Sequence, residues 1–201
     1  MSSEPTDLEL LEGWRAGNGD AGKQLFERHF DSIFGFFETK CPNDADDLVQ
    51  STFLACLKAK TQFRAESSFR TYLFTIARNE LYHLFRTRQR KDAKLDFELS
   101  SIAELISTPG TKLARNQEHR MVVEAMQHLP VEQQMLLELH YWEEQDIAAL
   151  AIVFDAPAAT IRTRLHRARL ALREQLESMA PAEALETLES MDRWVAKLPN
   201  P

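Results

Sequence analysis

The chain has 201 residues, of which 44% are hydrophobic, so it is long enough for one medium domain or two small ones, each with its own core. Its longest uninterrupted apolar runs are only a few residues, far short of the roughly 20 that span a bilayer. Residues 1–20 are acidic and lack the apolar stretch of a signal peptide. These features argue against an integral membrane protein and a secreted precursor, and we expect a soluble, cytoplasmic protein with no membrane insertion.

The average charge hides a segregation along the chain. A net charge of −7 and a pI near 5.4 would by themselves argue against a nucleic-acid partner. However, residues 51–94 carry ten basic and three acidic side chains, and residues 162–173 carry five arginines and no acid. The other segments are acidic. The sequence therefore has two basic islands in an acidic field, which keeps nucleic-acid binding open.

The sequence shows no catalytic or metal-binding pattern. Its six histidines have no HExxH or HxH spacing, and no glycine-rich phosphate loop is present. Cys41 and Cys56 form no CxxC pair and fit lone thiols of a reducing compartment. The acidic group Asp44, Asp46 and Asp47 lacks a second set of ligands and is better explained as an acidic helix N-terminus. We therefore expect a protein that is not an enzyme and needs no cofactor or metal.

Helical periodicity dominates the first half of the chain. Thr6 and Glu9 have the spacing of a capping box, and Gly17-Asn18-Gly19 would end the helix that follows it. No segment shows sustained strand-like alternation, so the predicted class is all-α. Further helices are expected over Phe26–Phe37, from Asn43 or Asp44 to Cys56, and over Phe69–Leu84, the last running into the basic stretch Arg86–Lys91.

The segment 92–113 is the best domain boundary, because it loses periodicity and contains Thr108-Pro109-Gly110. Beyond it, helices are expected up to Leu129-Pro130, over Gln133–Trp142, over Ile147–Phe154 with Asp146 as its cap, and from near Thr160 onward. The predicted organisation is a helical domain over 1–91, a flexible linker over 92–113, a second helical domain over 114–177 and a helical extension over 178–201.

The last two helices of the second domain have the pattern of a helix-turn-helix. A short capped helix is followed by a turn and by a helix whose apolar face carries Ile161, Leu165, Ala168 and Leu172. The five arginines of residues 162–173 have no acid among them, as expected if phosphates supply the opposite charge. A solvated basic helix in a four-helix bundle would give the same pattern, and the sequence leaves both interpretations open.

The first basic island also contains aromatic residues, a combination that can follow a nucleic-acid backbone and stack unpaired bases. Phe69 and Phe85 sit at helical spacing and are expected in the core. Phe63 lies in a predicted loop beside Arg64. Phe63 is therefore the better candidate for stacking on a base.

Two sets of motifs carry a resemblance to a known family. The stretch Asp46–Leu54 (DDLVQSTFL), followed by Phe69–Asn79 (FRTYLFTIARN) and Arg86, resembles region 2 of a bacterial extracytoplasmic-function (ECF) sigma factor. The residues Leu129-Pro130, Leu137 and Tyr141, followed by Thr160–Arg169 (TIRTRLHRAR), resemble region 4 of the same family. The matched blocks cover about 20–90 and 115–176 and stand in the family's order.

The resemblance implies a transcription initiation factor that brings core RNA polymerase to promoter DNA and helps to open it. It also implies roles for three groups of residues and a linker that runs through the RNA exit region of the polymerase. Core polymerase would be bound by Asp47, Gln50, Phe53 and Leu54. The minus-ten element would be bound by Phe63, Arg64, Ser67, Ser68, Arg70, Arg78, Asn79 and Arg86. The minus-thirty-five element would be bound by Thr160, Arg162, Thr163, Arg164, His166, Arg167 and Arg169.

The sequence leaves two other functions open. The main alternative to a sigma factor is a stand-alone helix-turn-helix regulator, and a further alternative is a sigma-like scaffold that has lost promoter recognition. Sigma factors of this type are commonly held inactive by an anti-sigma factor, but no residue here names one. The extension 178–201 either folds back on the second domain, engages a regulator or packs as a capping helix. The chain also departs from the family's usual pattern at Ala149, where glutamate is usual, at Asp155, where glycine is usual, and at Tyr72, where tryptophan is common.

Overall fold

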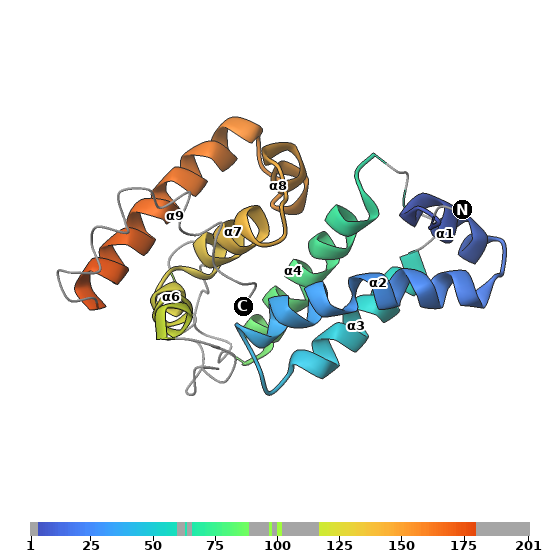
Figure 1. Cartoon of the computed structure of the whole chain (residues 1–201), viewed down its shortest axis with the longest axis horizontal. Coiled ribbons are helices and arrows are strands. Elements are labelled where there is room, and N and C mark those ends of the chain that lie inside the picture. Colours follow the sequence, from blue (N-terminus) through green and yellow to red (C-terminus); the bar gives the residue numbers. More distant parts are fainter. Residues whose placement is uncertain are drawn as a thin grey trace.

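The computed structural model describes residues 4–59, 63, 66–88, 97, 100–101 and 117–179, with backbone alone for 117–121. All the regular secondary structure within these residues is helical, apart from one isolated bridge between Ser101 and Pro130. The helices form an N-terminal and a C-terminal group that lie side by side (Figure 1). The prediction of an all-α fold with two helical domains is confirmed.

The N-terminal domain consists of α1 (Asp7–Arg15), α2 (Gly19–Glu38), α3 (Ala45–Ala59) and α4 (Phe69–Arg88). The predicted capping box is present, since Thr6 N donates to Glu9 at 2.7 Å and Glu9 N donates to Thr6 Oγ1 at 3.3 Å. The core of this domain is aromatic and aliphatic, and each large side chain fully buried in it contributes roughly 1.5–3 kcal/mol. Its largest fully buried apolar side chains are Leu11, Leu25, Ile33, Phe36, Phe37, Phe69, Leu73, Phe74, Leu81 and Phe85.

The C-terminal domain consists of α6 (Gln117–Gln127), α7 (Val131–Tyr141), α8 (Ile147–Val153) and α9 (Ala158–Met179). Asp146 caps α8 as predicted, accepting a hydrogen bond from Ala149 N at 2.7 Å. The predicted apolar face of α9 is also confirmed, because Ile161, Leu165, Ala168 and Leu172 are all buried. This helix starts two residues before Thr160 and ends at Met179. The remainder of the predicted extension lies outside the described residues.

Part of the predicted linker is packed against both domains. Phe97 stacks on Tyr82 of α4, with ring centroids 3.9 Å apart and planes at 2°. The first turn of α7 begins at Pro130, which offers no side-chain cap. The linker backbone takes that role, because Val131 N donates to Ser100 O at 2.9 Å and Glu132 N donates to Phe97 O at 3.1 Å. The rest of 92–113 lies outside the described residues.

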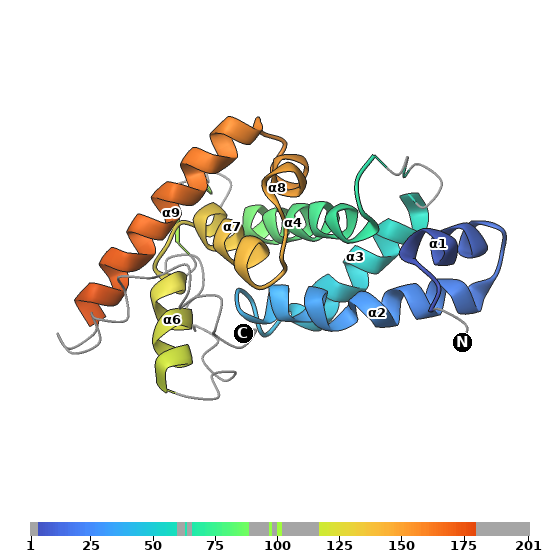
Figure 2. The same ribbon diagram turned by 45° about the horizontal axis from the view of Figure 1, so that its top comes forward.

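The two domains meet along α4, with α8 and α7 on the opposing side (Figures 1 and 2). Helix α7 is buried on almost every side, since it lies between α9 and the N-terminal domain. Its buried polar residue Glu138 faces Lys40, which follows α2. The sequence predicts two domains joined by a linker, and nothing in its local patterns predicts this shared face.

Candidate nucleic-acid interface

Helix α9 presents a basic face to solvent. Arg162, Thr163, His166 and Arg167 are all exposed, and their spacing places them on one side of the helix, opposite the buried apolar face. Thr163 Oγ1 donates to Ala159 O at 3.1 Å, so its hydroxyl is held along the helix. A helix anchored on one side and basic on the other is the recognition element of a helix-turn-helix.

Two of the predicted minus-thirty-five residues have a different environment. Arg164 Nη1 lies 3.1 Å from Glu132 Oε1 on α7, and the Arg169 guanidinium lies 5.6 Å from the centre of the Tyr141 ring. Both side chains are half-buried on the flank of α9 that faces α7. These two arginines attach α9 to α7, whereas the arginines of the exposed face make no such contact with α7. Thr160, in the first turn of α9, is half-buried as well.

The turn between α8 and α9 depends on Asp155, whose φ of +49° lies in the left-handed region. Glycine adopts this conformation without strain, and aspartate is one of the few other residues that tolerate it. The turn is closed by a hydrogen bond from Ala156 N to Ala151 O at 3.0 Å. The helix-turn-helix therefore forms although Asp155 replaces the glycine that is usual in the family it resembles.

On the N-terminal domain, Asp47, Gln50 and Leu54 lie along one exposed stripe of α3, with Phe53 half-buried beside them. Leu54 is 46% exposed, and the stripe continues to Leu57, which is 43% exposed. Leu54 and Leu57 are one turn apart, so their exposed apolar side chains adjoin each other on the helix surface. Leu57 could have been predicted from the sequence, because it continues the helical spacing of Asp47, Gln50 and Leu54 as the position i+10.

An apolar cavity of about 400 Å³ adjoins this stripe. Phe26 and Phe30 of α2 and Phe53 and Leu57 of α3 line it together with Trp14. Phe30 is 43% exposed and was also missed from the sequence, because its membership depends on how α2 packs against α3. The cavity and the stripe together form a mixed polar and apolar surface that suits a protein partner.

Four of the residues predicted to bind the minus-ten element lie on α4, and they have two kinds of environment. Asn79 and Arg86 are exposed, and the Arg86 guanidinium lies 5.6 Å from the centre of the Phe97 ring. Arg70 forms an ion pair with Glu143, and Arg78 donates to Val153 O, so both are engaged by the C-terminal domain. The predicted group is thus only partly open to solvent.

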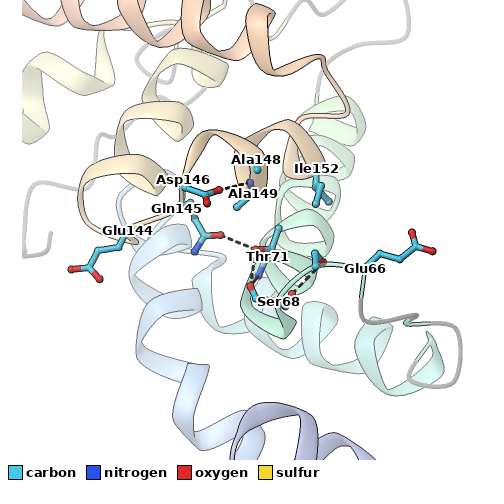
Figure 3. Close-up of a pocket in the computed structure, with 10 residues that line it drawn as sticks. Glu66, Ser68, Thr71, Glu144, Gln145, Asp146, Ala148, Ala149 and Ile152 are labelled. Carbon is cyan, nitrogen blue, oxygen red and sulfur yellow. Dashed lines mark hydrogen bonds between the residues drawn. The ribbon is translucent and has the colours of Figure 1, made fainter.

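Ser67 and Ser68 precede α4 and line an interdomain pocket of about 360 Å³ (Figure 3). Ser68 Oγ caps the start of α4 by accepting from Thr71 N at 3.0 Å. Glu144, Gln145 and Asp146 line the opposite side. Acidic side chains at this rim do not suit an anion, so the pocket is not a phosphate site in this arrangement.

The structure corrects the expectation for Phe63. The residue is only 7% exposed, and the centre of its ring lies 4.9 Å from that of Tyr72 and 6.1 Å from that of Phe69. Arg15 donates a hydrogen bond to the Phe63 carbonyl, which fixes the backbone at the same point. Phe63 is therefore a core residue here, packed on two aromatic side chains of α4. Arg64 lies outside the described residues.

The remaining expectations concern chemistry and membranes. Burial raises the pKa of both the Cys41 and the Cys56 thiol to about 12, so neither is a reactive thiolate near neutral pH. Among the described residues, no group of three histidine, cysteine, aspartate or glutamate side chains is arranged to hold a metal ion. In the same part of the chain, every helix is too short or too polar to cross a membrane.

Two helical domains, one of which exposes the basic helix of a helix-turn-helix, define a DNA-binding protein. Residues 25–91 match the Sigma-70 region 2 family and residues 119–172 match the Sigma-70 region 4 family. These two matches together span more than half of the chain. The chain therefore belongs to the sigma-70 family, and its relatives define it as a sigma factor of the ECF type, a transcription initiation factor for RNA polymerase.

The relatives match over nearly their whole length. An ECF RNA polymerase sigma-E factor of Haemophilus influenzae is 24% identical over 188 residues, which covers 89% of this chain and 100% of the relative. The sigma-E factor of Escherichia coli K12 is 26% identical, with 89% and 98% covered.

Two solved structures share the fold. The sigma factor RpoE of Bartonella quintana, in complex with the anti-sigma factor NepR, has a TM-score of 0.62 at 23% identity and covers 77% of this chain and 96% of its own. CnrH in complex with the cytosolic domain of CnrY has a TM-score of 0.65 at 24% identity, with 87% and 99% covered.

Proposed function

We propose that this sigma factor contacts core polymerase and promoter DNA through three separate surfaces. The observation that carries the proposal is the exposed face of α9, where Arg162, Thr163, His166 and Arg167 lie together. This face would enter the major groove of the minus-thirty-five element as duplex DNA, with arginine binding guanine edges or phosphates. Arg164 and Arg169 would keep the helix at the correct angle through Glu132 and Tyr141.

The second surface is the stripe on α3, which would bind core polymerase. Asp47 and Gln50 offer polar contacts, and Leu54 offers an exposed apolar side chain. Phe53 lines the adjoining cavity. We add Phe30 and Leu57 to this group, because an exposed apolar surface of this kind gains free energy when a partner buries it.

The third surface is the start and outer face of α4, which would bind the minus-ten element in its single-stranded form. Asn79 and Arg86 are open to solvent, whereas Arg70 and Arg78 become available only if the C-terminal domain moves. Ser67 and Ser68 lie at the N-terminus of this helix, where the Ser68 hydroxyl also caps α4. Phe63 is left out because it is buried.

In vitro transcription with core polymerase and a promoter library tests the proposal. We expect initiation from a restricted set of promoters when the full chain is added, and a loss of initiation for Arg162→Ala combined with Arg167→Ala. Binding of duplex DNA without any sequence-dependent initiation would instead indicate a stand-alone helix-turn-helix regulator. Unchanged DNA binding and initiation in the double variant would contradict the role of α9.

We also propose a protein partner of the anti-sigma class. The similar sigma factor RpoE has been solved with an anti-sigma factor, NepR, and the apolar cavity beside α3 offers a surface for such a partner here. A partner on this surface would compete with core polymerase. The site of action we propose is the cytoplasm, where the polymerase and the chromosome are found.

A further inference from the structure

Thr163 lies on the exposed face of α9, and its hydroxyl proton is already used within the helix. Thr163 Oγ1 donates to Ala159 O, one turn earlier, at 3.1 Å. A hydroxyl has a single proton to donate, so this bond leaves Thr163 no donor for the edge of a base. Because threonine side chains are staggered, an oxygen turned back to the helix leaves the methyl carbon in a different position on Cβ. The residue is exposed, so the group that it presents to a partner is this methyl.

Ala159 adds a second methyl group at the same place. It is exposed as well, and residues four positions apart are neighbours on one face of a helix. Both residues lie in the first two turns of α9, and the N-terminal residues of a recognition helix are those that reach base edges. By helical spacing, the two methyl groups lie between the exposed Arg162 and Arg167. They form a small apolar surface that two arginines border.

The composition of the recognition helix narrows the bases that it can recognise. Residues 158–173 contain no asparagine, glutamine, aspartate or glutamate. The helix therefore lacks the amide that pairs with adenine and the carboxylate that accepts from the amino group of cytosine. It has arginines, which suit guanine, and exposed methyl groups, which suit the 5-methyl group of thymine. An A·T pair is thus best recognised here from its thymine side.

We propose, on the basis of the function proposed above, that the methyl groups of Thr163 and Ala159 contact the 5-methyl group of a thymine in the minus-thirty-five element. Thr163 is then a specificity-determining residue, because a cytosine at the same position would lack the methyl group. Burying one methyl group corresponds to roughly fourfold in affinity. This is a small share of promoter binding, but it ranks one promoter above another.

The test uses polymerase holoenzyme with the full chain and a promoter duplex selected from the library. Each thymine of the minus-thirty-five element is replaced in turn by deoxyuridine, which lacks only the 5-methyl group, and affinity is measured by fluorescence anisotropy. Thr163→Ser keeps the hydroxyl and removes the methyl group, whereas Thr163→Val keeps the methyl group and removes the hydroxyl. Thr87→Ser is the matched control, since Thr87 is an exposed threonine of α4 whose hydroxyl likewise donates four positions back, to His83 O at 2.8 Å.

We expect deoxyuridine at one position to weaken binding by the parent, Thr163→Val and Thr87→Ser proteins by roughly fourfold. Thr163→Ser should bind the thymine promoter more weakly than the parent and be much less sensitive to the replacement. Three results overturn the inference and leave the proposed function standing: a parent that no deoxyuridine weakens, equal sensitivity in the parent and Thr163→Ser, or loss of sensitivity in Thr163→Val. Absence of promoter-dependent initiation by the parent overturns the proposed function and, with it, this inference.

Discussion

Lys40 and Glu138, which are 98 residues apart in the chain, form a buried ion pair between the two domains. The Lys40 side chain is fully buried and its ammonium lies 4.0 Å from the centre of the Phe36 ring. Burial raises the pKa of Glu138 to about 7, although the nearby Lys40 opposes that shift. The desolvation of the charged carboxylate therefore outweighs both its attraction to the lysine and its hydrogen bond with it.

Replacing Glu138 separates these two contributions. Glu138→Ala leaves Lys40 without its interdomain acceptor, and we expect the free energy of unfolding to fall by about 3 kcal/mol. Glu138→Gln keeps an oxygen that accepts from Lys40 and avoids the desolvation of a charge, so we expect a change below about 1 kcal/mol. Urea denaturation of the full chain measures both. Equal losses in the two variants would show that the charge itself is required.

The raised pKa of Glu138 also predicts a pH dependence. The native carboxyl binds its proton more tightly than an exposed carboxyl, whose pKa is near 4.5. Its contribution to stability is therefore complete below pH 4.5 and is lost as the pH rises through about 7. The free energy of unfolding of the parent should decline relative to that of Glu138→Gln over this interval, and a constant difference would contradict the assignment.

The comparison with Glu138→Gln is needed because His29 contributes a slope of opposite sign. Burial lowers the pKa of His29, and this effect exceeds that of Asp7, whose carboxylate lies 2.7 Å from His29 Nε2. A lowered histidine pKa stabilises the native state above pH 6.5, and this stabilisation is lost as the pH falls. Since both proteins contain His29, its contribution cancels in their difference.

Gly22 is required by the indole of Trp14. A β-carbon at position 22 would lie 2.5 Å from Trp14 Cδ1 and 2.6 Å from Nε1, and the indole is itself buried against Phe26. We expect Gly22→Ala to destabilise the N-terminal domain by about 1–3 kcal/mol, because α1 must shift to accommodate the methyl group. Gly19→Ala is the matched control, since a β-carbon at position 19 would meet nothing within 4 Å beyond its own stretch of helix. Thermal denaturation should show a lower melting temperature for Gly22→Ala and an unchanged one for Gly19→Ala.

The left-handed conformation of Asp155 predicts an unusual order of substitutions. Asp155→Ala should cost about 1 kcal/mol, because alanine tolerates a positive φ poorly. Asp155→Gly and Asp155→Asn should be close to neutral, since both residues adopt this conformation readily. Chemical denaturation of the three variants gives the order. A loss in Asp155→Asn equal to that in Asp155→Ala would indicate that the carboxylate, and not the backbone, matters.

The features that sequence predicted well are local ones. The capping box of Thr6 and Glu9, the Asp146 cap and the buried face of α9 each depend on residues within a few turns of one helix. Periodicity and capping chemistry are complete within such a window. The core positions of Phe69 and Phe85 were predicted for the same reason and are confirmed.

The features that sequence missed depend on pairing between distant segments. Arg70 meets Glu143 across 73 positions, and Phe97 stacks on Tyr82 from within a segment without periodicity. Phe63 turns inward because Tyr72 and Phe69 offer it an aromatic surface. A charge count could locate the basic islands, but it could not tell which arginines the fold itself would occupy.

The exposed face of α9 predicts how binding should depend on salt. Each arginine that neutralises a phosphate releases a counterion, so its removal reduces the slope of log affinity against log salt by about 1. Arg167→Ala should therefore weaken promoter binding by the polymerase holoenzyme and reduce that slope. Arg173→Ala is the matched control from the same helix, because Arg173 is paired with Glu177 at 2.7 Å and lies beyond the predicted contact residues. Fluorescence anisotropy over a series of salt concentrations measures the slopes. Equal slopes for the parent and Arg167→Ala would place this arginine away from the phosphates.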